Sequence, residues 1–361
     1  MKLPTPRRWM VRATTLLLPV LLPVLLAVAA AAGAGAANVT QAVSTVIAAT
    51  AVATPDISRR ASLTLAVSDN PYAAPALLAE AQGYFADEGL KLKVIHCSIG
   101  RICLQHLLDG KAHFATVADV PIVMASFQRR DLGIVTTLTT SGREYRIVVR
   151  PERGIRRAED LRGKRIGTIM GSTGQYFTES YLLYHGIDRA NVTLVPLDPQ
   201  DPSSALVRGE VDAAGLFEPH VRDAQRRLGP RVALLPASGF FTNTFNLVSV
   251  SAASGASDDD IVRLLRALQR AVNMMRNEPF AARTIVARAL HMDVGALARS
   301  WDDFDFKLDL GQPLITHLEA QGRWALREHL VPADTPLPDY LNMIRSAPLR
   351  RLDPRAVRLV Q

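Results

Sequence analysis

Two matching stretches decide the fold: LLDGKAHFA at residues 107–115 and LVRGEVDAA at residues 206–214. Each contains an apolar pair, then a glycine that ends a helix, then a short run typical of a strand. A proline follows each stretch within a few residues, at Pro121 and Pro219. We interpret the match as a duplicated structural unit, which predicts two lobes of related architecture. Two doubly wound lobes would form a ligand cleft between them, at the carboxyl ends of their strands.

Short apolar runs alternate with amphipathic stretches on both sides of these units. Strands are expected at 63–67, 91–96, 113–117, 133–138, 164–169, 192–195, 212–216 and 232–235. Helices are expected at 75–82, 102–108, 120–127, 175–184 and 203–207. Strands that alternate with helices need crossover connections, so the sheets are mostly parallel and the fold class is α/β. From about residue 257 onward we expect helices and no further strands.

The composition excludes several other classes of protein. Of 361 residues, 21% are charged and 48% are hydrophobic, unlike a disordered, collagen-like or disulfide-dense chain. The net charge of +8 comes from the two ends, because residues 1–37 and 345–361 carry +4 each and the rest is neutral. Nucleic-acid binding needs Lys and Arg clustered on a folded face, so we expect no nucleic-acid partner.

The N-terminus is typical of an export signal. Residues 1–12 are basic and contain no acid, and residues 13–37 form an uncharged run that ends in small residues. We predict a signal peptide over 1–37, a linker over 38–61 and a periplasmic location. The uncharged run is also long enough to anchor the chain in a membrane, so cleavage and anchoring both stay open.

The corner between the 164–169 strand and the 175–184 helix is a candidate anion site. Gly171, Ser172, Thr173 and Gly174 leave backbone N–H groups open at the positive end of a helix. Carboxylate, sulfonate and phosphate groups suit such a corner. The alternative is plain N-capping by Ser172 or Thr173. The P-loop lysine is absent, which argues against a nucleoside triphosphate.

Three further strand-to-helix corners carry candidate ligand residues. They are Asn70, Ser98 together with Gly100, and Asp119. Their shared position at the carboxyl ends of strands favours a role in binding, because ligands of open α/β sheets bind there. Each corner also fits an ordinary loop.

The two cysteines lie close together in the sequence, among three histidines. Three interpretations of Cys97 and Cys103 stay open: a disulfide between strand end and helix start, two buried thiols, or a metal site. The paired ligand spacing of a zinc finger is absent, so we expect no metal and no cofactor. His113 fits a core histidine of its strand.

Other conspicuous stretches carry no catalytic pattern. A nucleophile with a matching base does not stand out, so we do not expect an enzyme. The acidic stretch WDDFDF at 301–306 does not match a calcium loop, and we interpret it as a solvated helix end. The basic residues 345–361 are expected to form a loosely packed surface segment, with contact to anionic lipid headgroups as the alternative.

The chain resembles the solute-binding proteins of ABC importers in the nitrate, sulfonate, taurine and thiamine-precursor superfamily. The resemblance rests on five stretches in the family's order: LLAEAQGYFADEGL at 77–90, LLDGKAHFA at 107–115, DLRGKRIG at 160–167, GST at 171–173 and GEVDAAGLFEP at 209–219. It implies a two-lobe type II periplasmic-binding fold with two hinge crossings. The implied boundaries are hinges near 145–149 and 246–250, lobe one over 62–145 and 247–330, lobe two over 146–246 and a C-terminal tail over 331–361.

The resemblance also implies positions for the ligand. The family's ligand residues carry over to Ser98, Gly100, Asp119, Ser172, Thr173, Glu218, Asn243 and Thr244. Three features depart from the family pattern: Cys97 precedes a ligand loop, His113 stands where an Asp is usual, and the LFEP stretch lacks a Trp-Asp pair. These departures leave the substrate class open.

The predicted function is that of an exported, non-enzymatic binding protein for a small anionic organic solute such as a sulfonate, taurine or nitrate. The expected partners are that solute and an ABC permease in the membrane, and the chain is expected to be a monomer. Two alternatives stay open: a ligand-sensing receptor module outside the cytoplasm, and an enzyme on the same fold.

Overall fold

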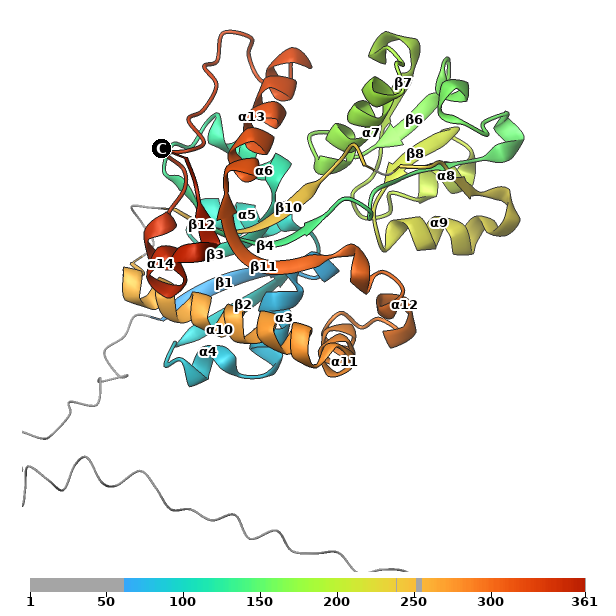
Figure 1. Cartoon of the computed structure of the whole chain (residues 1–361). Coiled ribbons are helices and arrows are strands. Elements are labelled where there is room, and N and C mark those ends of the chain that lie inside the picture. Colours follow the sequence, from blue (N-terminus) through green and yellow to red (C-terminus); the bar gives the residue numbers. More distant parts are fainter. Residues whose placement is uncertain (1–61, 238, 251–254, 361) are drawn as a thin grey trace, which may run out of the picture. The chain divides into compact units, whose positions relative to one another are not determined.

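Two separate sheets divide the protein, and the chain passes between them twice. The computed structural model describes residues 62–237, 239–250 and 255–360, so the predicted signal peptide (1–37) and linker (38–61) lie outside the described residues. The larger sheet has the strand order β12-β11-β4-β10-β3-β1-β2, and the smaller sheet has the order β7-β6-β8-β5-β9 (Figure 1).

The predicted alternation of strands and helices is confirmed up to β9, except that β5 follows β4 with no helix between them and was not among the expected strands. The larger sheet consists of β1 (Leu63–Ser68), β2 (Leu92–Cys97), β3 (Phe114–Ala118), β4 (Leu132–Ser141), β10 (Asn243–Val250), β11 (Asp305–Gly311) and β12 (Val357–Arg358). The smaller sheet consists of β5 (Arg146–Val149), β6 (Arg165–Thr168), β7 (Thr193–Pro196), β8 (Ala213–Leu216) and β9 (Ala233–Leu234). In each sheet a trio of strands is parallel, with β1 between β2 and β3 and β6 between β7 and β8. The prediction of mostly parallel sheets is nevertheless wrong, because the pairings of β10 with β3 and β4, of β4 with β11 and of β5 with β8 and β9 are antiparallel. Strands β5 and β10 enter their sheets from the passages between the sheets and not through a helical crossover.

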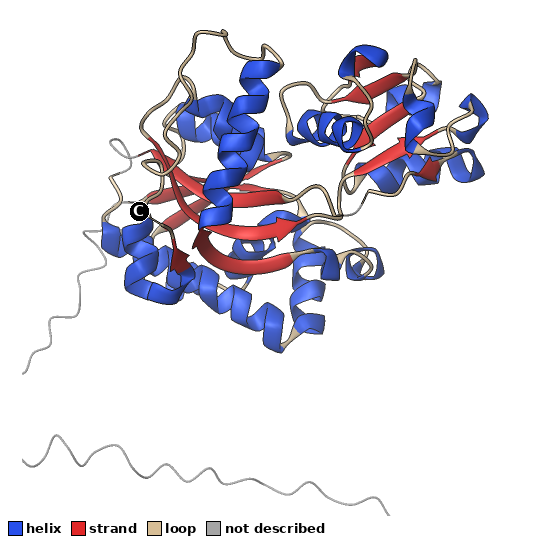
Figure 2. Ribbon diagram, turned by 45° about the horizontal axis from the view of Figure 1, so that its top comes forward, coloured by secondary structure: helices blue, strands red, loops and turns tan. Residues whose placement is uncertain are grey.

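Helices lie against both sheets (Figure 2). Around the larger sheet these are α3 (Ala74–Ala81), α4 (Tyr84–Asp87), α5 (Gly100–Leu108), α6 (Asp119–Ser126), α10 (Asp258–Asn277), α11 (Pro279–Ala289), α12 (Val294–Ala298), α13 (Gln312–Arg327) and α14 (Ser346–Leu352). Around the smaller sheet these are α7 (Thr173–Tyr184), α8 (Ser204–Arg208) and α9 (His220–Leu228). The long helix α10 begins with a capping box of Ser257 and Asp260, and its apolar face is buried in the core of the larger sheet.

The repeated stretch forms the same structure in both halves. Helix α5 is followed by Gly110 and strand β3, and helix α8 is followed by Gly209 and strand β8. The two glycines have φ angles of 72° and 77°, a left-handed conformation that glycine adopts without strain. The helix–glycine–strand interpretation of the repeat is therefore confirmed.

The two passages between the sheets lie a few residues before the predicted hinges. The chain leaves the larger sheet through 142–145, between β4 and β5, and returns through 235–242, between β9 and β10. The predicted hinge segments 145–149 and 246–250 largely coincide with the regular strands β5 and β10 instead. Their β-like sequences reflect burial in a sheet, since every residue of β10 is buried.

The expectation of helices alone after residue 257 is wrong. The acidic stretch at 301–306 is not a helix end but a short 3-10 turn (Trp301–Asp303) that leads into β11. Strand β11 pairs antiparallel with β4 and extends the larger sheet. Its sequence DFKLDLG alternates apolar and polar residues with the period of a strand, so Leu308 and Leu310 are buried while the acids face outward.

The C-terminal segment is packed rather than loose. Tyr340, Met343 and Leu349 are buried in the core of the larger sheet, and β12 pairs with β11. The basic residues meet acids of the same body: Arg351 lies 2.7 Å from Asp259, and Arg358 lies 2.6 Å from Asp309. The arginines of this segment therefore serve to attach it to the body, which corrects the prediction of a loosely packed tail.

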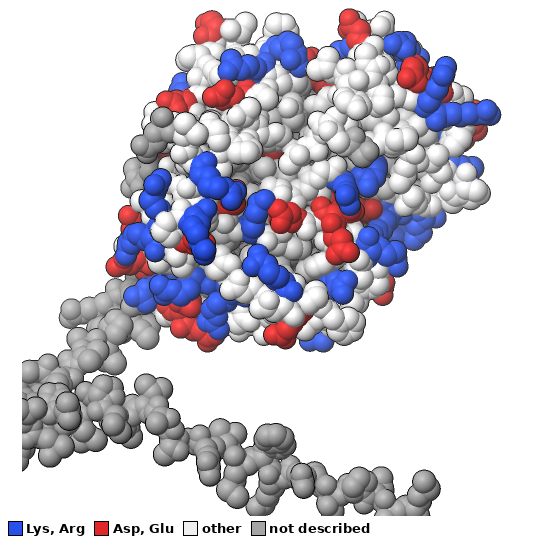
Figure 3. All heavy atoms as spheres, viewed as in Figure 1, with Lys and Arg blue, Asp and Glu red and all other residues white. Residues whose placement is uncertain are grey.

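Charges of both signs are interspersed on the face shown in Figure 3. Arg270, for example, lies between Asp87 and Glu88, and Arg266 lies 3.0 Å from Glu88. Within the described ranges, no helix has the length and hydrophobicity needed to cross a membrane.

Candidate functional site

Six of the predicted ligand residues line one small cavity of about 80 Å³. They come from both sheets: Asn70, Gly100 and Asn243 from the larger one, and Ser172, Thr173 and Glu218 from the smaller one. The remaining lining residues are Tyr72, Ile99, Arg101, Ala118, Tyr145, Ile169, Phe217 and Phe245. Several of them lie at or just after the last residues of strands β1, β3, β6 and β8, so the cavity lies at the strands' carboxyl ends, as predicted.

The N-termini of two helices meet at this cavity. Gly100 and Arg101 form the first turn of α5, and Thr173 is the first residue of α7. The first N–H groups of a helix have no partner within it, and the helix dipole makes this end positive. The ends of two helices at one cavity, of 9 and 12 residues, favour the binding of an anionic group between them.

Ser172 also performs the structural role that the sequence left open. Its hydroxyl group accepts a hydrogen bond from the Gly174 N–H at 3.0 Å and donates one to the Ile169 carbonyl oxygen at 2.6 Å. The side chain is therefore engaged as the N-cap of α7. The N–H groups of Gly171 and Gly174, which the sequence predicted to be open, have partners within the corner, so the N–H groups of Ser172 and Thr173 are the candidate donors to the cavity.

Gly100 is tightly packed. A Cβ atom at this position would lie 3.3 Å from the Phe245 ring, the Thr116 carbonyl oxygen and the Val117 Cα. The glycine therefore lets the start of α5 lie directly on strand β3 and on a ring of β10.

Two side chains of opposite charge line the cavity. In the part of the chain that the structure describes, Arg101 is the one cation and Glu218 the one acid among the lining residues. The Glu218 Oε1 atom lies 3.3 Å from Nε of Arg222, whereas its Oε2 atom is buried without a hydrogen-bond partner.

Three buried polar side chains lie together beside the cavity. The Tyr72 hydroxyl lies within weak hydrogen-bonding reach of the Glu144 and Asn243 side chains. Tyr72, Glu144 and Asn243 are 5%, 3% and 1% exposed. Burial raises the pKa of Glu144 well above its usual range, the hydrogen bond with Tyr72 opposes this shift in part, and the nearby Glu218 and Asp303 carboxylates raise that pKa further.

Three predicted ligand residues are not at the cavity wall. Ser98 is exposed and does not line the cavity. Asp119 is completely buried, and its carboxylate accepts hydrogen bonds from the N–H groups of Val120 and Thr244 at 2.8 and 2.9 Å. It also lies 2.8 Å from Nε2 of His317, so this acid joins α6, β10 and α13. Thr244 likewise serves this network and is absent from the wall.

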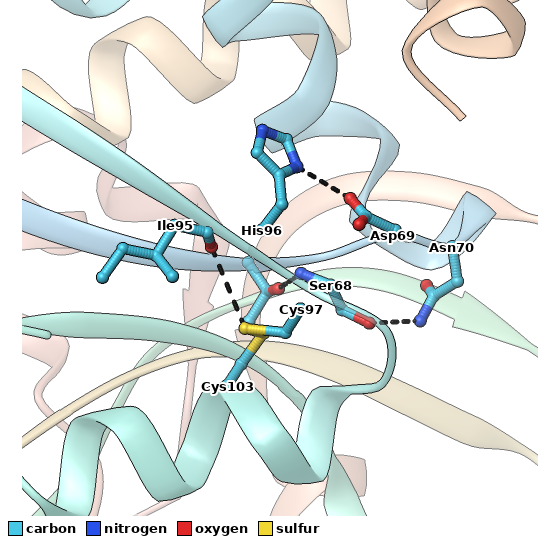
Figure 4. Close-up of a disulfide and its surroundings, with 8 residues drawn as sticks. Ser68, Asp69, Asn70, Ile95, His96, Cys97 and Cys103 are labelled. Carbon is cyan, nitrogen blue, oxygen red and sulfur yellow. Dashed lines mark hydrogen bonds and ion pairs between the residues drawn. A yellow bond between two sulfur atoms is a disulfide. The ribbon is translucent and has the colours of Figure 1, made fainter. Parts of the chain in front are cut away.

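A disulfide closes the loop that carries Gly100 and Arg101 (Figure 4). Cys97 at the end of β2 is bonded to Cys103 on α5, with the two Cα atoms 5.7 Å apart. Of the three interpretations that the sequence left open, the structure contains the disulfide. Among the described residues, no three His, Cys, Asp or Glu side chains form a group that could hold a metal ion.

The neighbouring histidines have other partners. His113 is half-buried just before β3, and its Nδ1 atom accepts a hydrogen bond from the Thr64 N–H at 2.9 Å. His96 lies 2.7 Å from Asp69 and 3.2 Å from Glu80. Burial lowers the pKa of His96, but these two carboxylates outweigh burial and raise it above its usual value.

Helices α7 and α13 connect the two sheets beside the cavity. The Trp324 indole donates a hydrogen bond to Oε2 of Glu179 at 2.7 Å, and the Tyr176 ring packs edge-on against Trp324 at 5.1 Å. On α7, Gln175 donates to Oε1 of Glu179 and accepts from the Gly171 N–H, both at 2.8 Å. Hydrogen bonds therefore connect Gly171, beside the smaller sheet, to Trp324 on α13, beside the larger sheet.

Sequence reasoning missed Tyr72, Arg101 and Glu144. Tyr72 and Arg101 directly follow the corners that were identified, so inspection of the next residues would have found them. Glu144 carries no local signal, because its burial depends on how the 142–145 passage packs between the two sheets.

The comparisons with known proteins agree with this architecture. The profile of the family described as NMT1/THI5 like matches residues 70–282. A putative aliphatic sulfonates-binding protein of Bacillus subtilis (strain 168) is 27% identical over 55% of this chain and 61% of the relative. The taurine-binding periplasmic protein of Escherichia coli (strain K12) is 28% identical over 43% of this chain and 48% of the relative. The alignments therefore span only about half to three fifths of these relatives.

Solved structures share the whole fold. The alkanesulfonate-binding protein of Xanthomonas axonopodis pv. citri, solved with MOPS bound, matches 79% of this chain and 98% of its own, with a TM-score of 0.68 and 18% identity. This match shows a two-lobe periplasmic-binding fold, as predicted.

Two enzymes also resemble this chain. The 4-amino-5-hydroxymethyl-2-methylpyrimidine phosphate synthase of Aspergillus parasiticus is 25% identical over 59% of this chain and 65% of its own length. The desulfurization enzyme DSZB matches 81% of this chain and 99% of its own with a TM-score of 0.58 and 16% identity.

Proposed function

The chain belongs to the NMT1/THI5-like family, and from this premise we propose that it is the exported solute-binding component of an ABC importer. It captures a small anionic organic solute between its two lobes and delivers it to a permease in the membrane. The relatives named for sulfonate and taurine binding support this role. We assign the larger sheet with its helices to lobe one and the smaller sheet with its helices to lobe two.

One observation carries the proposal: the first turns of α5 and α7, from opposite lobes, meet at one cavity beside Arg101. An anion in this position receives backbone N–H groups from both lobes and a guanidinium charge from one of them. Such a ligand stabilises the arrangement in which the lobes are close together, a hinge transition that a membrane partner can recognise.

The ligand class follows from the size and charge of the cavity. A volume of about 80 Å³ suits a small solute rather than a nucleotide or a peptide. Sulfonate, carboxylate and nitrate groups all present oxygen atoms that accept from N–H groups. We propose a monomer located in the periplasm, released from its signal or held at the membrane by it.

An enzyme on this fold is the second candidate, favoured by the likeness to the pyrimidine phosphate synthase and to DSZB. Among the described residues that line the cavity there is no His or Cys to act as base or nucleophile. A receptor that signals to a membrane partner would use the same cavity and differ in the partner it contacts.

Thermal unfolding with a panel of small anions tests the proposal. A ligand at a hundred times its dissociation constant adds about 2.7 kcal/mol to the free energy of unfolding. We expect ethanesulfonate, a carboxylate or nitrate to raise the melting temperature without being consumed. A folded protein that responds to none of them, or that converts the ligand, would contradict a binding-protein function.

A further inference from the structure

Arg222 connects the wall of the cavity to the opposite lobe. This residue lies on α9, beside the smaller sheet, and its Nε atom lies 3.3 Å from Oε1 of Glu218, which lines the cavity. Its Nη1 atom donates a hydrogen bond at 2.7 Å to the Ala296 carbonyl oxygen on α12, beside the larger sheet (Figure 1). A single guanidinium group therefore contacts an acid of the cavity and the backbone of the other lobe.

The bond to α12 uses a carbonyl group near the end of that helix, where a helix does not supply all the donors itself. The N–H groups that follow α12 donate to the carbonyl oxygens of Gly295 and Leu297, on either side of Ala296. The guanidinium of Arg222 is the donor to the Ala296 oxygen between them. Arginine side chains commonly bind the last carbonyl groups of a helix in this way.

The other arginines of α9 have partners in their own lobe. Arg226 pairs with Asp223 on the same helix, and Arg227 lies 2.9 Å from Asp201 and 3.1 Å from Asp223. The Arg222 side chain is 26% exposed, against 75% for Arg226 and 34% for Arg227. The helix therefore offers a matched control for the residue that reaches the opposite lobe.

The charge of Glu218 opposes the proposed ligand unless a cation neutralises it. A carboxylate on the wall of a small cavity repels an anion, and the repulsion is strong where little water screens it. Arg222 supplies the compensating charge, and its bond to Ala296 fixes the guanidinium in place. That bond needs the two lobes to be close together, because its donor and its acceptor belong to different lobes.

We propose that Arg222 is a positioning residue that makes anion binding and closure of the lobes depend on each other. When the lobes are together, the guanidinium is fixed between Glu218 and α12, and the cavity accepts an anion beside Arg101. When the lobes separate, the guanidinium loses the Ala296 oxygen and turns toward solvent, so the charge of Glu218 opposes the anion. The coupling is reciprocal, so the anion stabilises closure as much as closure strengthens its binding. This inference rests on the proposed function, because it requires an anion in the cavity.

A double-mutant cycle measured by calorimetric titration tests the inference. The probe is the one of ethanesulfonate, acetate and nitrate that the unaltered protein binds most tightly. Arg222→Gln should weaken its binding by about tenfold, because Gln is shorter and carries no charge. Glu218→Gln added to that variant should then raise the affinity by about threefold or more, because the repelling charge is gone. Glu218→Gln alone should bind the probe as tightly as the unaltered protein or more tightly.

Arg226→Gln is the matched control, because it removes an arginine of the same helix whose partner is Asp223. It should leave the affinity for the probe unchanged.

A pair of spin labels measures closure of the lobes directly. The labels are attached through Lys111→Cys and Glu210→Cys, exposed and equivalent positions of the repeat that lie in opposite lobes. A saturating probe should shorten the distance between the labels in the unaltered protein and in the Arg226→Gln control. In the Arg222→Gln protein a population with the longer distance should remain.

The outcomes separate this inference from the proposed function. If Arg222→Gln matches the control in affinity or in label distances, or if Glu218→Gln restores no affinity to it, the coupling is wrong while the anion-binding function stands. If the folded unaltered protein binds no small anion, the proposed function fails and this inference with it. Should Arg222→Gln not fold, Glu218→Gln alone decides, since weaker binding there would make Glu218 a ligand contact and overturn the inference.

Discussion

Arg101 and Glu218 place opposite charges on the wall of one small cavity, and their surroundings decide what each can do. Arg101 is exposed in the first turn of α5, where its charge adds to that of the helix end. Glu218 is held by Arg222, whose guanidinium also donates to the Ala296 carbonyl oxygen at 2.7 Å. The acid is therefore fixed in position, whereas the Arg101 side chain lines the cavity, is exposed and has no ion-pair partner among the described residues.

Replacing Arg101 with Gln should weaken anion binding by about tenfold, because a charge-assisted hydrogen bond contributes roughly 1.5–3 kcal/mol. Calorimetric titration of the anion that gives the largest thermal shift measures this loss. Arg276→Gln, an exposed arginine of α10, is the control. Equal affinity in both variants would show that Arg101 does not contact the ligand.

Glu144 should make the empty protein less stable at high pH. Its folded-state pKa is raised by burial, so the folded form holds a proton that the unfolded chain loses above its ordinary pKa. The stability that this proton maintains is complete below the ordinary pKa and is lost as pH rises. Glu144→Gln should therefore raise the melting temperature at pH 8 relative to the unaltered protein and change it little at pH 5. The expected rise is about 2–4 °C for each kcal/mol gained in the free energy of unfolding.

The same pH series with Glu159→Gln provides the comparison, since this carboxylate is exposed. A Glu144→Gln protein that loses stability between pH 5 and pH 8 as the unaltered one does would contradict the assignment of a buried, protonated acid.

At the scale of elements, the loop between β2 and α5 is held at both ends by the disulfide. Cys97 and Cys103 flank the residues that bring Gly100 and Arg101 to the cavity. The double substitution to Ser should cost about 2 kcal/mol of unfolding free energy by the chain-entropy account for so short a loop. It should also weaken ligand binding several-fold, because the start of α5 gains freedom that binding must remove.

Denaturant unfolding and ligand titration with and without a reducing agent measure both effects. Reductant should reproduce the double substitution in the unaltered protein and have no effect on the variant. An unaltered affinity after reduction would show that packing alone positions the loop.

The contact between α7 and α13 should favour the ligand-bound arrangement of the lobes. Trp324→Phe keeps an aromatic ring against Tyr176 but removes the indole donor to Glu179, whose carboxylate is buried. We expect weaker ligand binding by about tenfold, since a lost bond to a buried charged group costs roughly 1–3 kcal/mol. Trp301→Phe, an indole packed on Phe306 instead, is the control and should leave the affinity unchanged.

The elements also show which parts of the fold a sequence reveals. Strands β1, β3 and β6 and their following corners were predictable, because apolar runs bounded by turn residues are local signals. Strand β11 was missed because its acids dominated the interpretation, although Phe306, Leu308 and Leu310 alternate along it. The C-terminal segment was misjudged because its arginines are neutralised by Asp259 and Asp309, acids distant in the sequence.

At the scale of the whole molecule, the site exists only where the two lobes meet. Corners that the sequence identified separately, at Asn70, Gly100, Thr173 and Asn243, line one cavity because strand ends from both sheets converge there. Asp119 also follows a strand end, yet it does not line the cavity, because its carboxylate is hydrogen-bonded to Thr244 and lies against His317. Which side of a corner faces a ligand is decided by packing between lobes, and no local pattern encodes it.

Native mass spectrometry of the gently purified protein tests the central claim most directly. We predict one small-molecule adduct per chain, either carried over from the cell or restored by adding a small organic anion, with its mass unchanged after incubation. The Arg101→Gln protein should lose this adduct at lower activation energy. A folded chain that retains no adduct with any small anion offered, or that returns the ligand with an altered mass, would contradict the account.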